Sequence, residues 1–240
     1  MKPSISLVIP AYNEEILLPR LLKSVRTACE VFAGRFGGSV EVIVADNTST
    51  DGTAEVARTF GCRVVAVERR VIAAARNGGA RVASAPVIAF VDADLQIHPD
   101  TFVRIHEAMS SGQCIAGATG WRFERSSPGL RATELVTRLV TRVLHVDGGV
   151  VFCSRDAFDA VSGYNEARNV GEDVQFLLDL RRFGKSQGGI VLLSIGAVAI
   201  VSTRKWDIHG DWHMFFMPYW PIIQRRSMSA VVQDYWYRER

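Results

Sequence analysis

Two aspartates, Asp92 and Asp94, directly follow the apolar run Val87–Val91, with only Ala93 between them. The run is typical of a buried strand, and ligands of open α/β sheets bind at the carboxyl ends of strands. Two carboxylates this close repel each other unless a cation or a shared proton offsets the repulsion. Mg²⁺ or Mn²⁺ carrying a diphosphate suits the pair, because a hard cation takes carboxylates together with phosphate oxygens. The structural alternative is a pair of turn carboxylates capping a helix that begins near Pro99.

Two further polar segments follow the first two expected strands. Pro10–Glu14 comes after the first strand, and the turn Asp46–Thr53 comes after the second. Because the carboxyl ends of neighbouring parallel strands meet at one edge of a sheet, both segments should line the same crevice. There Tyr12 could stack on a nucleobase, and the side-chain amide of Asn47 could hydrogen-bond to the edge of that base.

Two later segments carry charged side chains suited to a transfer reaction. Glu172 and Asp173 open an expected helix, and either carboxylate could serve as a general base. Arg204 and Lys205 could contact a diphosphate, because a guanidinium makes strong charge-assisted hydrogen bonds to phosphate oxygens. A solvated basic turn is the structural alternative for this second pair.

The elements that must position these residues alternate between strand and helix through the first hundred residues. The strand segments are rich in β-branched residues, and apolar residues recur at i, i+3 and i+4 in the segments between them. This alternation predicts a parallel, doubly wound α/β sheet, and the absence of linkers or repeats predicts one domain over residues 1–240. The expected strands are Ser4–Ile9 (closed by Pro10), Glu41–Ala45, Arg63–Val67 and Val87–Val91, and the expected helices are 18–32, a helix from Ala54, and Ile72–Val82.

The second half of the chain is less regular. Its expected helices are Thr101–Met109, Leu130–Val146 and Glu172–Phe183 (stopped by Gly184), and its expected strands are Cys114–Thr119 and Val150–Cys153. The long helix is amphipathic, with arginines on or near its polar side. The apolar stretch from Ile190 to Val201 is too short to cross a bilayer, which takes about 20 residues.

Composition narrows the function classes. The chain has 240 residues, 48% of them hydrophobic, and a formal net charge of +3. The hydrophobic content supports a sizeable core, whereas the small positive charge suits an anionic small substrate or a membrane surface and is too weak to indicate nucleic acid. Four widely spaced cysteines without a C-x-x-C pair indicate a reducing compartment. No signal-peptide pattern is visible, so a cytoplasmic protein is expected.

The segment MFFMPYWPII (residues 214–223) is dense in aromatic and apolar residues and is followed by Arg225 and Arg226. It is too short to span a bilayer. It could cover the core, close over the active site, form a homodimer contact, or lie peripherally at the inner face of a membrane, where aromatic and basic residues both fit.

The ordered set of motifs resembles the family 2 glycosyltransferases, whose nucleotide-sugar-binding domain has the GT-A fold. The resemblance covers Ser6 to about His213. The matching segments are SLVIPAYNEE, VIVADNTSTDGT, AAARNGGARVASAPVIAFVDADLQIHPD and GGVVFCSRDAFDAVSGYNEARNVGEDVQFLLDLRRFGK. The resemblance implies a three-layer α/β/α sandwich with a mostly parallel central sheet. It divides the domain into a nucleotide-sugar-binding half (1–98), an acceptor half (99–213) and a C-terminal segment (214–240).

The resemblance also implies roles for individual residues. Asp94 would bind a metal directly, and Asp92 would assist with metal or ribose contacts. Arg76 would lie near the nucleotide, and Asp173 would deprotonate the acceptor. Related enzymes place a late histidine on the metal or phosphate; His209 is the first candidate here and His213 the second. The nucleotide-sugar-binding residues expected overall are Pro10, Tyr12, Glu14, Asn47, Arg76, Asp92, Ala93, Asp94 and Arg204.

The chain departs from the family pattern at one position that bears on the donor. The family often has a second aspartate in its second turn, where this chain has Asn47. An amide oxygen can still accept a hydrogen bond from uracil or thymine N3–H, so UDP-, dTDP- and GDP-linked donors all remain open. The motif DADLQIHP is also close to the version in polyprenyl-phosphate sugar transferases, which keeps a lipid phosphate among the sugar, lipid and small-molecule acceptors.

The expected function is therefore a metal-dependent glycosyltransferase that moves a sugar from a nucleotide-diphosphate sugar to a hydroxyl or phosphate acceptor. An inverting displacement with Asp173 as base is the expected mechanism. A polyprenyl-phosphate sugar transferase and a catalytically silent nucleotide-sugar-binding protein are the alternatives. A nucleotidyltransferase would have a glycine-rich loop after the first strand, where this chain has Tyr12–Glu15. A phosphatase with an Asp-x-Asp nucleophile would usually have Thr or Val at the position of Gln96.

Overall fold

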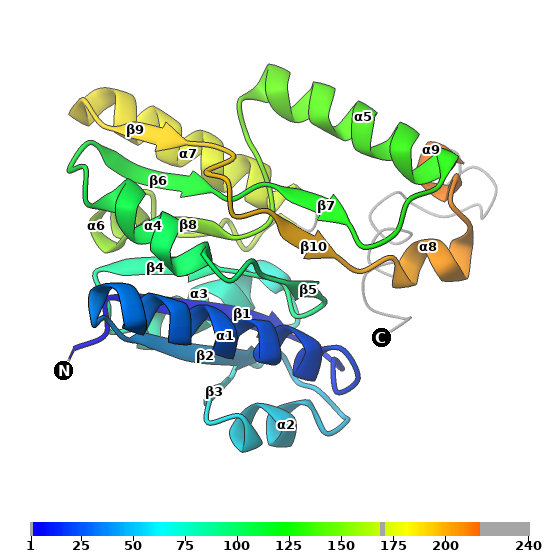
Figure 1. Cartoon of the computed structure of the whole chain (residues 1–240), viewed down its shortest axis with the longest axis horizontal. Coiled ribbons are helices and arrows are strands. Elements are labelled where there is room, and N and C mark those ends of the chain that lie inside the picture. The colour runs from blue at the N-terminus through cyan, green and yellow to red at the C-terminus, as the bar shows by residue number, and fades with distance from the viewer. Residues whose placement is uncertain (1, 169–170, 217–240) are drawn as a thin grey trace.

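The computed structural model describes residues 2–168 and 171–216, and its main sheet is mixed but mostly parallel (Figure 1). The strands are β1 (Ile5–Ala11), β2 (Val40–Asp46), β3 (Arg63–Ala66), β4 (Val87–Phe90), β5 (Leu95–Gln96), β6 (Cys114–Ala118), β7 (Trp121–Phe123), β8 (Val151–Ser154), β9 (Ile190–Leu192) and β10 (Ala199–Val201). The helices are α1 (Leu18–Phe36), α2 (Thr53–Thr59), α3 (Ile72–Val82), α4 (Thr101–Met109), α5 (Pro128–Leu144), α6 (Arg155–Ala160), α7 (Glu172–Gln187), α8 (Arg204–His209) and α9 (His213–Phe216).

The main sheet has the strand order β3-β2-β1-β4-β8-β6-β9. All neighbouring pairs are parallel except those of β8, which runs antiparallel to both β4 and β6. The parallel order of β3, β2, β1 and β4 confirms the doubly wound arrangement expected for the first hundred residues. The carboxyl ends of β1, β2 and β4 consequently meet at one edge of the sheet, where the predicted site residues follow.

Helices cover both faces of this sheet, which confirms the three-layer α/β/α sandwich. In Figure 1, α1 and α4 lie in front of the sheet, and α3, α6 and α7 lie behind it. The alternation of side chains along β1 separates the two cores, because successive residues of a strand point to opposite faces. Leu7 and Ile9 pack with α1 and α4 on one face, whereas Val8 packs with α3 and α7 on the other.

Pro10 does not close the first strand, contrary to the expectation from the sequence. β1 continues to Ala11, and Pro10 pairs with Ala45 of β2. A proline has no N–H to donate, so a central strand normally excludes it. Here the ladder between β1 and β4 ends at Val8, which leaves the β4 side of β1 without a ladder partner at Pro10. The proline therefore sits where no hydrogen bond is lost.

Gly184 does not end the last long helix, which was expected to stop at Phe183. α7 runs on to Gln187 and ends at Gly188, whose φ of 71° is the left-handed conformation typical of a helix end. A Cβ at position 184 would lie 3.0 Å from the backbone oxygen of Gly189. The glycine inside the helix is explained by this close approach rather than by helix termination.

A small second sheet with the order β5-β10-β7 was not expected from the sequence. Its strands have two or three residues each, too few for a periodic pattern. The apolar stretch from Ile190 to Val201 contributes to both sheets, because Ser194 (φ 53°) and Gly196 (φ 90°) separate β9 from β10. None of the helices in the described part of the chain is long and apolar enough to cross a membrane.

The predicted C-terminal segment lies outside the described residues from Met217 onward. Its first residues belong to α9, which follows α8 (Figure 1). Of the elements expected in the second half, α4, α5, β6 and β8 lie within two residues of their expected positions, whereas α6 and α8 were not expected. The division into halves at residue 98 remains a prediction.

Candidate functional site

The loops after β1 and β2 are fastened to each other at the carboxyl edge of the sheet. The backbone N–H of Asn13 donates to Ser49 Oγ at 3.0 Å, and the N–H of Glu14 donates to Thr53 Oγ1 at 2.8 Å. In return, Asn13 Oδ1 accepts from the N–H of Thr50 at 2.8 Å. These reciprocal bonds hold the two predicted nucleotide segments side by side, as the sequence indicated.

Tyr12 lies under an arginine that the sequence analysis did not single out. The Tyr12 side chain is buried, and the guanidinium carbon of Arg70 lies 4.1 Å from its ring centroid. An arginine stacked on an aromatic ring is a favourable cation–π arrangement. One face of the tyrosine is thus occupied, and a base stacking on it would have to share the ring with Arg70 or displace it. Arg69 and Arg70 follow β3 at the same edge of the sheet, and that position is the signal that could have identified them.

Asn47 is held rigidly by its amide nitrogen. It is buried, and its Nδ2 donates to the backbone oxygens of Val67 at 2.9 Å and Arg69 at 2.7 Å. The Oδ1 atom takes part in neither bond. The two hydrogen bonds of Nδ2 therefore fix the orientation of Oδ1, which is the atom expected to accept a hydrogen bond from the base.

Arg76 of α3 is the centre of the charged cluster. Its side chain is 4% exposed, and it pairs with Asp92 at 2.7 Å, Glu172 at 2.9 Å and Asp173 at 2.9 Å. Its guanidinium carbon also lies 5.1 Å from the centroid of the Tyr164 ring. The structure therefore brings together four residues that the sequence placed in the site, from α3, the loop after β4, and α7. The pKa of Arg76 is raised further by Asp173 and Asp92 despite its burial, so the guanidinium stays charged.

The cluster holds more negative charge than Arg76 can neutralise. One guanidinium faces three carboxylates, which leaves two formal negative charges at the end of β4. Burial, together with Asp92 and Glu172, raises the pKa of Asp173 to about 7, although Arg76 opposes the rise. The Asp173 side chain is still 39% exposed, so it remains within reach of a substrate.

Glu172 and Asp173 owe their position to the start of α7. Gly171 precedes the helix with φ 69°, a left-handed conformation that a residue with a side chain adopts only with strain. The two acids then occupy the first helical turn, where the helix dipole stabilises negative charge. This turn faces α3, so both carboxylates reach the guanidinium of Arg76.

The Asp92–Asp94 motif has suitable donors for a divalent metal. Asp92 is 41% exposed and uses Oδ1 to accept from Arg76, while Ala93 is buried and Asp94 is half-buried. Two hard carboxylates match Mg²⁺ or Mn²⁺ when a diphosphate supplies the remaining oxygens. Within residues 2–168 and 171–216, no three His, Cys, Asp or Glu side chains gather closely enough to hold a metal.

His209 is consequently not joined to the two aspartates in this structure. It lies in α8, and its ring centroid is 5.5 Å from that of His213. His213 Nδ1 lies 2.8 Å from the backbone oxygen of Gly210, and burial lowers the pKa of His213. The predicted metal contact of His209 stays a prediction.

Glu14 and Arg204 form a buried ion pair between the loop after β1 and α8. The carboxylate of Glu14 is 1% exposed, and its two oxygens accept from the two Nη atoms of Arg204 at 3.3 Å each. The pair brings Arg204 to the predicted edge of the sheet. It also engages the Glu14 carboxylate with a protein partner, and the predicted contact of Glu14 with a nucleotide remains a prediction.

Two solved structures resemble this fold over most of the chain. Glucosyl-3-phosphoglycerate synthase from Mycobacterium tuberculosis, in complex with Mn²⁺, uridine diphosphate and phosphoglyceric acid, has a TM-score of 0.63 and 25% identity, and the match covers 88% of this chain and 75% of that one. S. aureus TarS in complex with UDP-GlcNAc has a TM-score of 0.65 and 18% identity, with 85% and 59% covered. These matches confirm the GT-A fold.

Curated relatives match shorter stretches. Validoxylamine A glucosyltransferase from Streptomyces hygroscopicus subsp. limoneus is 40% identical over 106 residues, which cover 40% of this chain and 22% of the relative. Undecaprenyl-phosphate 4-deoxy-4-formamido-L-arabinose transferase from Aeromonas hydrophila subsp. hydrophila is 32% identical over 149 residues, which cover 59% and 44%. The chain thus spans less than half the length of these two relatives.

The sequence profile described as glycosyl transferase family 2 matches residues 6–158, more than half of the chain. The matched region contains the loops after β1 and β2, Arg76, and the Asp92–Asp94 motif. The chain belongs to glycosyl transferase family 2.

Proposed function

We propose that this protein is a metal-dependent glycosyltransferase that uses a nucleotide-diphosphate sugar as donor. The observation that carries the proposal is the cluster of Asp92, Glu172 and Asp173 around the single guanidinium of Arg76. Its excess negative charge at the carboxyl end of β4 is suited to a divalent cation and to an acceptor that gives up a proton. The synthase from M. tuberculosis, which shares the fold, was solved with Mn²⁺ and uridine diphosphate.

The donor would lie along the edge formed by the loops after β1, β2 and β4. Asn47 Oδ1 would accept a hydrogen bond from the base, near the stacked pair of Tyr12 and Arg70. Asp92 and Asp94 would hold Mn²⁺ or Mg²⁺. When bound, the cation would neutralise negative charge on the leaving diphosphate. Arg204 lies beside the loop after β1 and could add a contact to the diphosphate if its bond to Glu14 is exchanged.

Asp173 would act as the general base in a single displacement. The acceptor oxygen forms a bond to the anomeric carbon while the bond from that carbon to the diphosphate oxygen breaks. The acceptor proton passes to the Asp173 carboxylate, and the anomeric configuration inverts. A pKa of about 7 suits this task, because a base is most effective when its pKa lies near the working pH. Glu172, 12% exposed and bonded to Arg76, would position the guanidinium rather than take the proton.

A lipid phosphate is the second candidate acceptor. The undecaprenyl-phosphate transferase from A. hydrophila is 32% identical over 149 residues, a match to 59% of this chain. A phosphate acceptor is already ionised at neutral pH and needs no base, so Asp173 would then matter less for turnover. Asp173→Asn therefore distinguishes the two acceptor classes once an acceptor is in hand.

Calorimetric titration with UDP, dTDP and GDP, each with and without Mn²⁺, tests the proposed donor site. We expect one nucleotide to bind in a manganese-dependent manner, Asp94→Ala to abolish that dependence, and Asp173→Asn to bind almost as well as the parent protein. Equal loss of binding in both variants would contradict the separate roles. If no nucleotide binds with or without manganese, the proposed function is wrong. Binding without any turnover on hydroxyl or phosphate acceptors would identify a silent nucleotide-sugar-binding protein.

A further inference from the structure

Helix α5 presents most of its large apolar residues to solvent, Leu130 being the buried exception. Leu135, Leu139 and Val143 recur at i, i+4 spacing and are 61%, 57% and 77% exposed. Val136, Val140 and Leu144 form the adjacent row and are 47%, 50% and 39% exposed. Residues spaced in this way share one helix face. We call these six residues the α5 apolar face.

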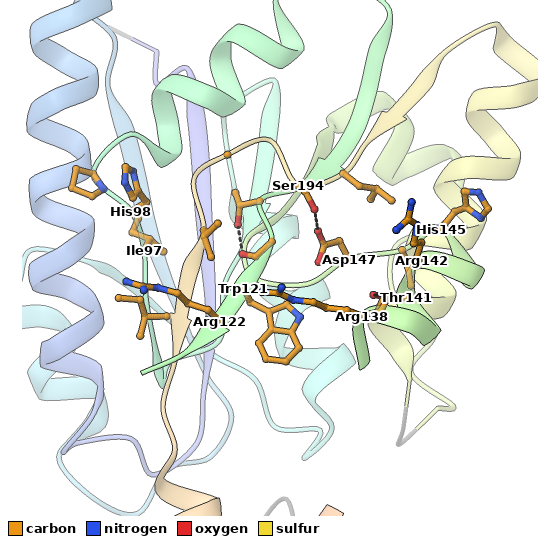
Figure 2. A pocket seen from close by; sticks show the side chains of 18 residues that line it. Ile97, His98, Trp121, Arg122, Arg138, Thr141, Arg142, His145, Asp147 and Ser194 are labelled. Carbon is orange, nitrogen blue, oxygen red and sulfur yellow. Dashed lines mark hydrogen bonds between the residues drawn. The ribbon is translucent and has the colours of Figure 1, made fainter. Parts of the chain in front are cut away.

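The opposite side of α5 is polar and lines a cavity of about 970 Å³. Arg138 and Arg142 contribute from α5, His145 from the position after its last residue, and Arg122 from β7 across the cavity (Figure 2). We call this cavity the α5 pocket. The helix is thus amphipathic in the inverse sense: its polar side is turned toward the protein and its apolar side away from it. A surface helix of a soluble protein normally has the opposite arrangement.

The α5 pocket has an excess of positive charge. Arg138 pairs with Glu134, but Arg122 and Arg142 form no ion pair with any residue in the described ranges 2–168 and 171–216. The lining carboxylate, Asp147, accepts from the Ser194 hydroxyl, a bond visible in Figure 2. A cavity with two uncompensated guanidinium groups is suited to an anion, and phosphate matches guanidinium geometry closely.

The pocket borders the proposed catalytic edge. Asp147 leads through two glycines into β8, and Val151 of β8 pairs with Phe90 at the end of β4. Asp92 lies two residues beyond Phe90. An anion in the α5 pocket would therefore lie on the side of the molecule where the Asp92–Asp94 motif follows its strand.

The segment that packs against the start of α5 also exposes large apolar residues. Gly129 at the start of α5 packs so closely on Asp211 that a Cβ would lie 2.7 Å from the Asp211 backbone oxygen. On the α8–α9 side of this contact, Ile208, Trp212 and Phe215 are 54%, 50% and 37% exposed. Tryptophan and phenylalanine beside a leucine- and valine-rich helix are typical of the interface between membrane and water.

Charge decides between the occupants that could cover this face. Helix α5 carries Arg131, Arg138 and Arg142 against the single acid Glu134, a net charge of +2. A second copy of α5 would bring the same positive charge to the contact. Residues 217–240 contain four arginines and two acids, so they too carry +2. An anionic lipid surface is the occupant whose charge complements the arginines while its acyl region accepts the apolar face.

We propose that α5 docks the protein on an anionic lipid bilayer through the α5 apolar face, with the phosphate headgroup of a lipid held in the α5 pocket. The valines and leucines enter the boundary between headgroups and acyl chains. The arginines of the pocket then lie at headgroup depth. Docking does not depend on the proposed function. Only a role of the bound lipid as sugar acceptor would rest on that function.

Vesicle co-sedimentation of the full chain tests the proposal. We expect the protein to sediment with vesicles that contain phosphatidylglycerol and to bind pure phosphatidylcholine vesicles more weakly. Leu139→Asp should weaken binding by about tenfold or more, because it places a charge in the apolar face. The matched control is Ile16→Asp, which puts the same charge on a residue that is 86% exposed and far from α5 in the sequence, and should not change binding.

The pocket arginines have their own test. Arg122→Gln and Arg142→Gln should each weaken binding to phosphatidylglycerol vesicles by about fivefold and affect binding to phosphatidylcholine less, because choline compensates the charge of its phosphate. A melting-temperature rise with inorganic phosphate that requires Arg142, in a protein that binds no vesicles, would show a soluble phosphate ligand and overturn the lipid assignment.

The competing occupants give different results. If residues 217–240 cover the α5 apolar face, the full chain will not bind vesicles and Leu139→Asp will lower the melting temperature. If a second copy covers it, the parent protein will be a dimer that Leu139→Asp separates, again without vesicle binding. Either result overturns the proposal. The vesicle assay needs no nucleotide and the nucleotide titration needs no vesicle, so failure of docking and failure of the proposed function are distinguishable.

Discussion

Arg76 Nη1 lies 2.9 Å from Asp173 Oδ1, and yet the pKa of that carboxyl is raised to about 7. Burial is the largest cause, and the two other carboxylates that share the guanidinium, Asp92 and Glu172, add to it. An arginine in contact with one carboxylate normally lowers its pKa. Here the single positive charge is divided among three acids, which leaves Asp173 with a proton affinity suited to a base at neutral pH.

The first prediction concerns the pH dependence of the transfer reaction. Asp173 can accept a proton only in its ionised form, so kcat/KM on a hydroxyl acceptor should rise with pH and level off above a pKa of about 7. Asp173→Asn should lose this rise together with about a hundredfold or more of kcat. Initial rates over the range from pH 5.5 to 9 check it, and a flat profile in the parent protein would show that Asp173 is not the base.

The same carboxyl should affect stability in the opposite direction. The folded-state pKa of about 7 lies above the ordinary aspartate pKa of 3.8, so the folded protein binds the proton more tightly than the unfolded chain. The contribution of this group to stability is therefore present at acidic pH and lost as the pH rises toward 7 and beyond. Asp173→Asn should raise the melting temperature at pH 8 and change it little at pH 4. A larger gain at pH 4 than at pH 8 would contradict the raised pKa.

Removing the shared guanidinium should be costly. Arg76→Met keeps most of the side-chain volume but leaves Asp92, Glu172 and Asp173 without their common cation. We expect a loss of about 3 kcal/mol or more in the free energy of unfolding at pH 8, because breaking a buried ion pair strands the remaining charges. Urea unfolding measures it. Lowering the pH to 5 should recover part of the loss, since the carboxylates then take up protons. A deficit that is independent of pH would indicate lost packing against Tyr164 instead.

The sequence predicted the parallel half of the fold because long strands and helices leave periodic patterns. β1, β2, β4 and α3 follow directly from runs of apolar and β-branched residues, and their order predicts where Asp92 falls. The small sheet was missed because β5, β7 and β10 have two or three residues each, too few to show alternation. Gly184 was misread because glycine commonly ends a helix, whereas here it allows a close backbone contact with Gly189, which a pattern of apolar residues does not reveal.

The site was predictable as a set of residues but not as a set of bonds. The motifs placed Arg76, Asp92 and Asp173 in one site, and the structure shows them in contact. The partner of Glu14 could not be foreseen, because Arg204 is 190 residues away and meets it only through tertiary packing. The inverse orientation of α5 was equally hidden, since its pattern shows two faces but not which one is turned toward the protein.

The ion pair between Glu14 and Arg204 yields a prediction about stability and donor binding together. Arg204→Met should cost about 3 kcal/mol, because the Glu14 carboxylate is 1% exposed and would lose its ion pair with Arg204. Glu14→Gln in the same chain should recover most of that loss. Chemical denaturation of the two single variants and the double variant gives the coupling energy.

Nucleotide titration of the same three variants separates the roles of the pair. If Arg204 also contacts the diphosphate, the double variant should be stable but bind the donor more weakly than the parent protein. Unchanged donor binding in the double variant would restrict Arg204 to positioning the loop after β1.

The glycines before β8 provide the last prediction, because they set the backbone beside the end of β4. Gly149 has φ 84°, and a Cβ there would lie 2.2 Å from the backbone oxygen of Gly120. Gly149→Ala should therefore destabilise the protein by about 2 kcal/mol or more, through strain and overpacking of backbone against backbone. The matched control is Gly34→Ala in α1, where a Cβ meets nothing within 4 Å and the helical backbone suits alanine. That variant should gain about 0.5–1 kcal/mol. Thermal and urea unfolding of both variants check the pair, and a stable Gly149→Ala protein would mean that the Gly120 backbone can move away without cost.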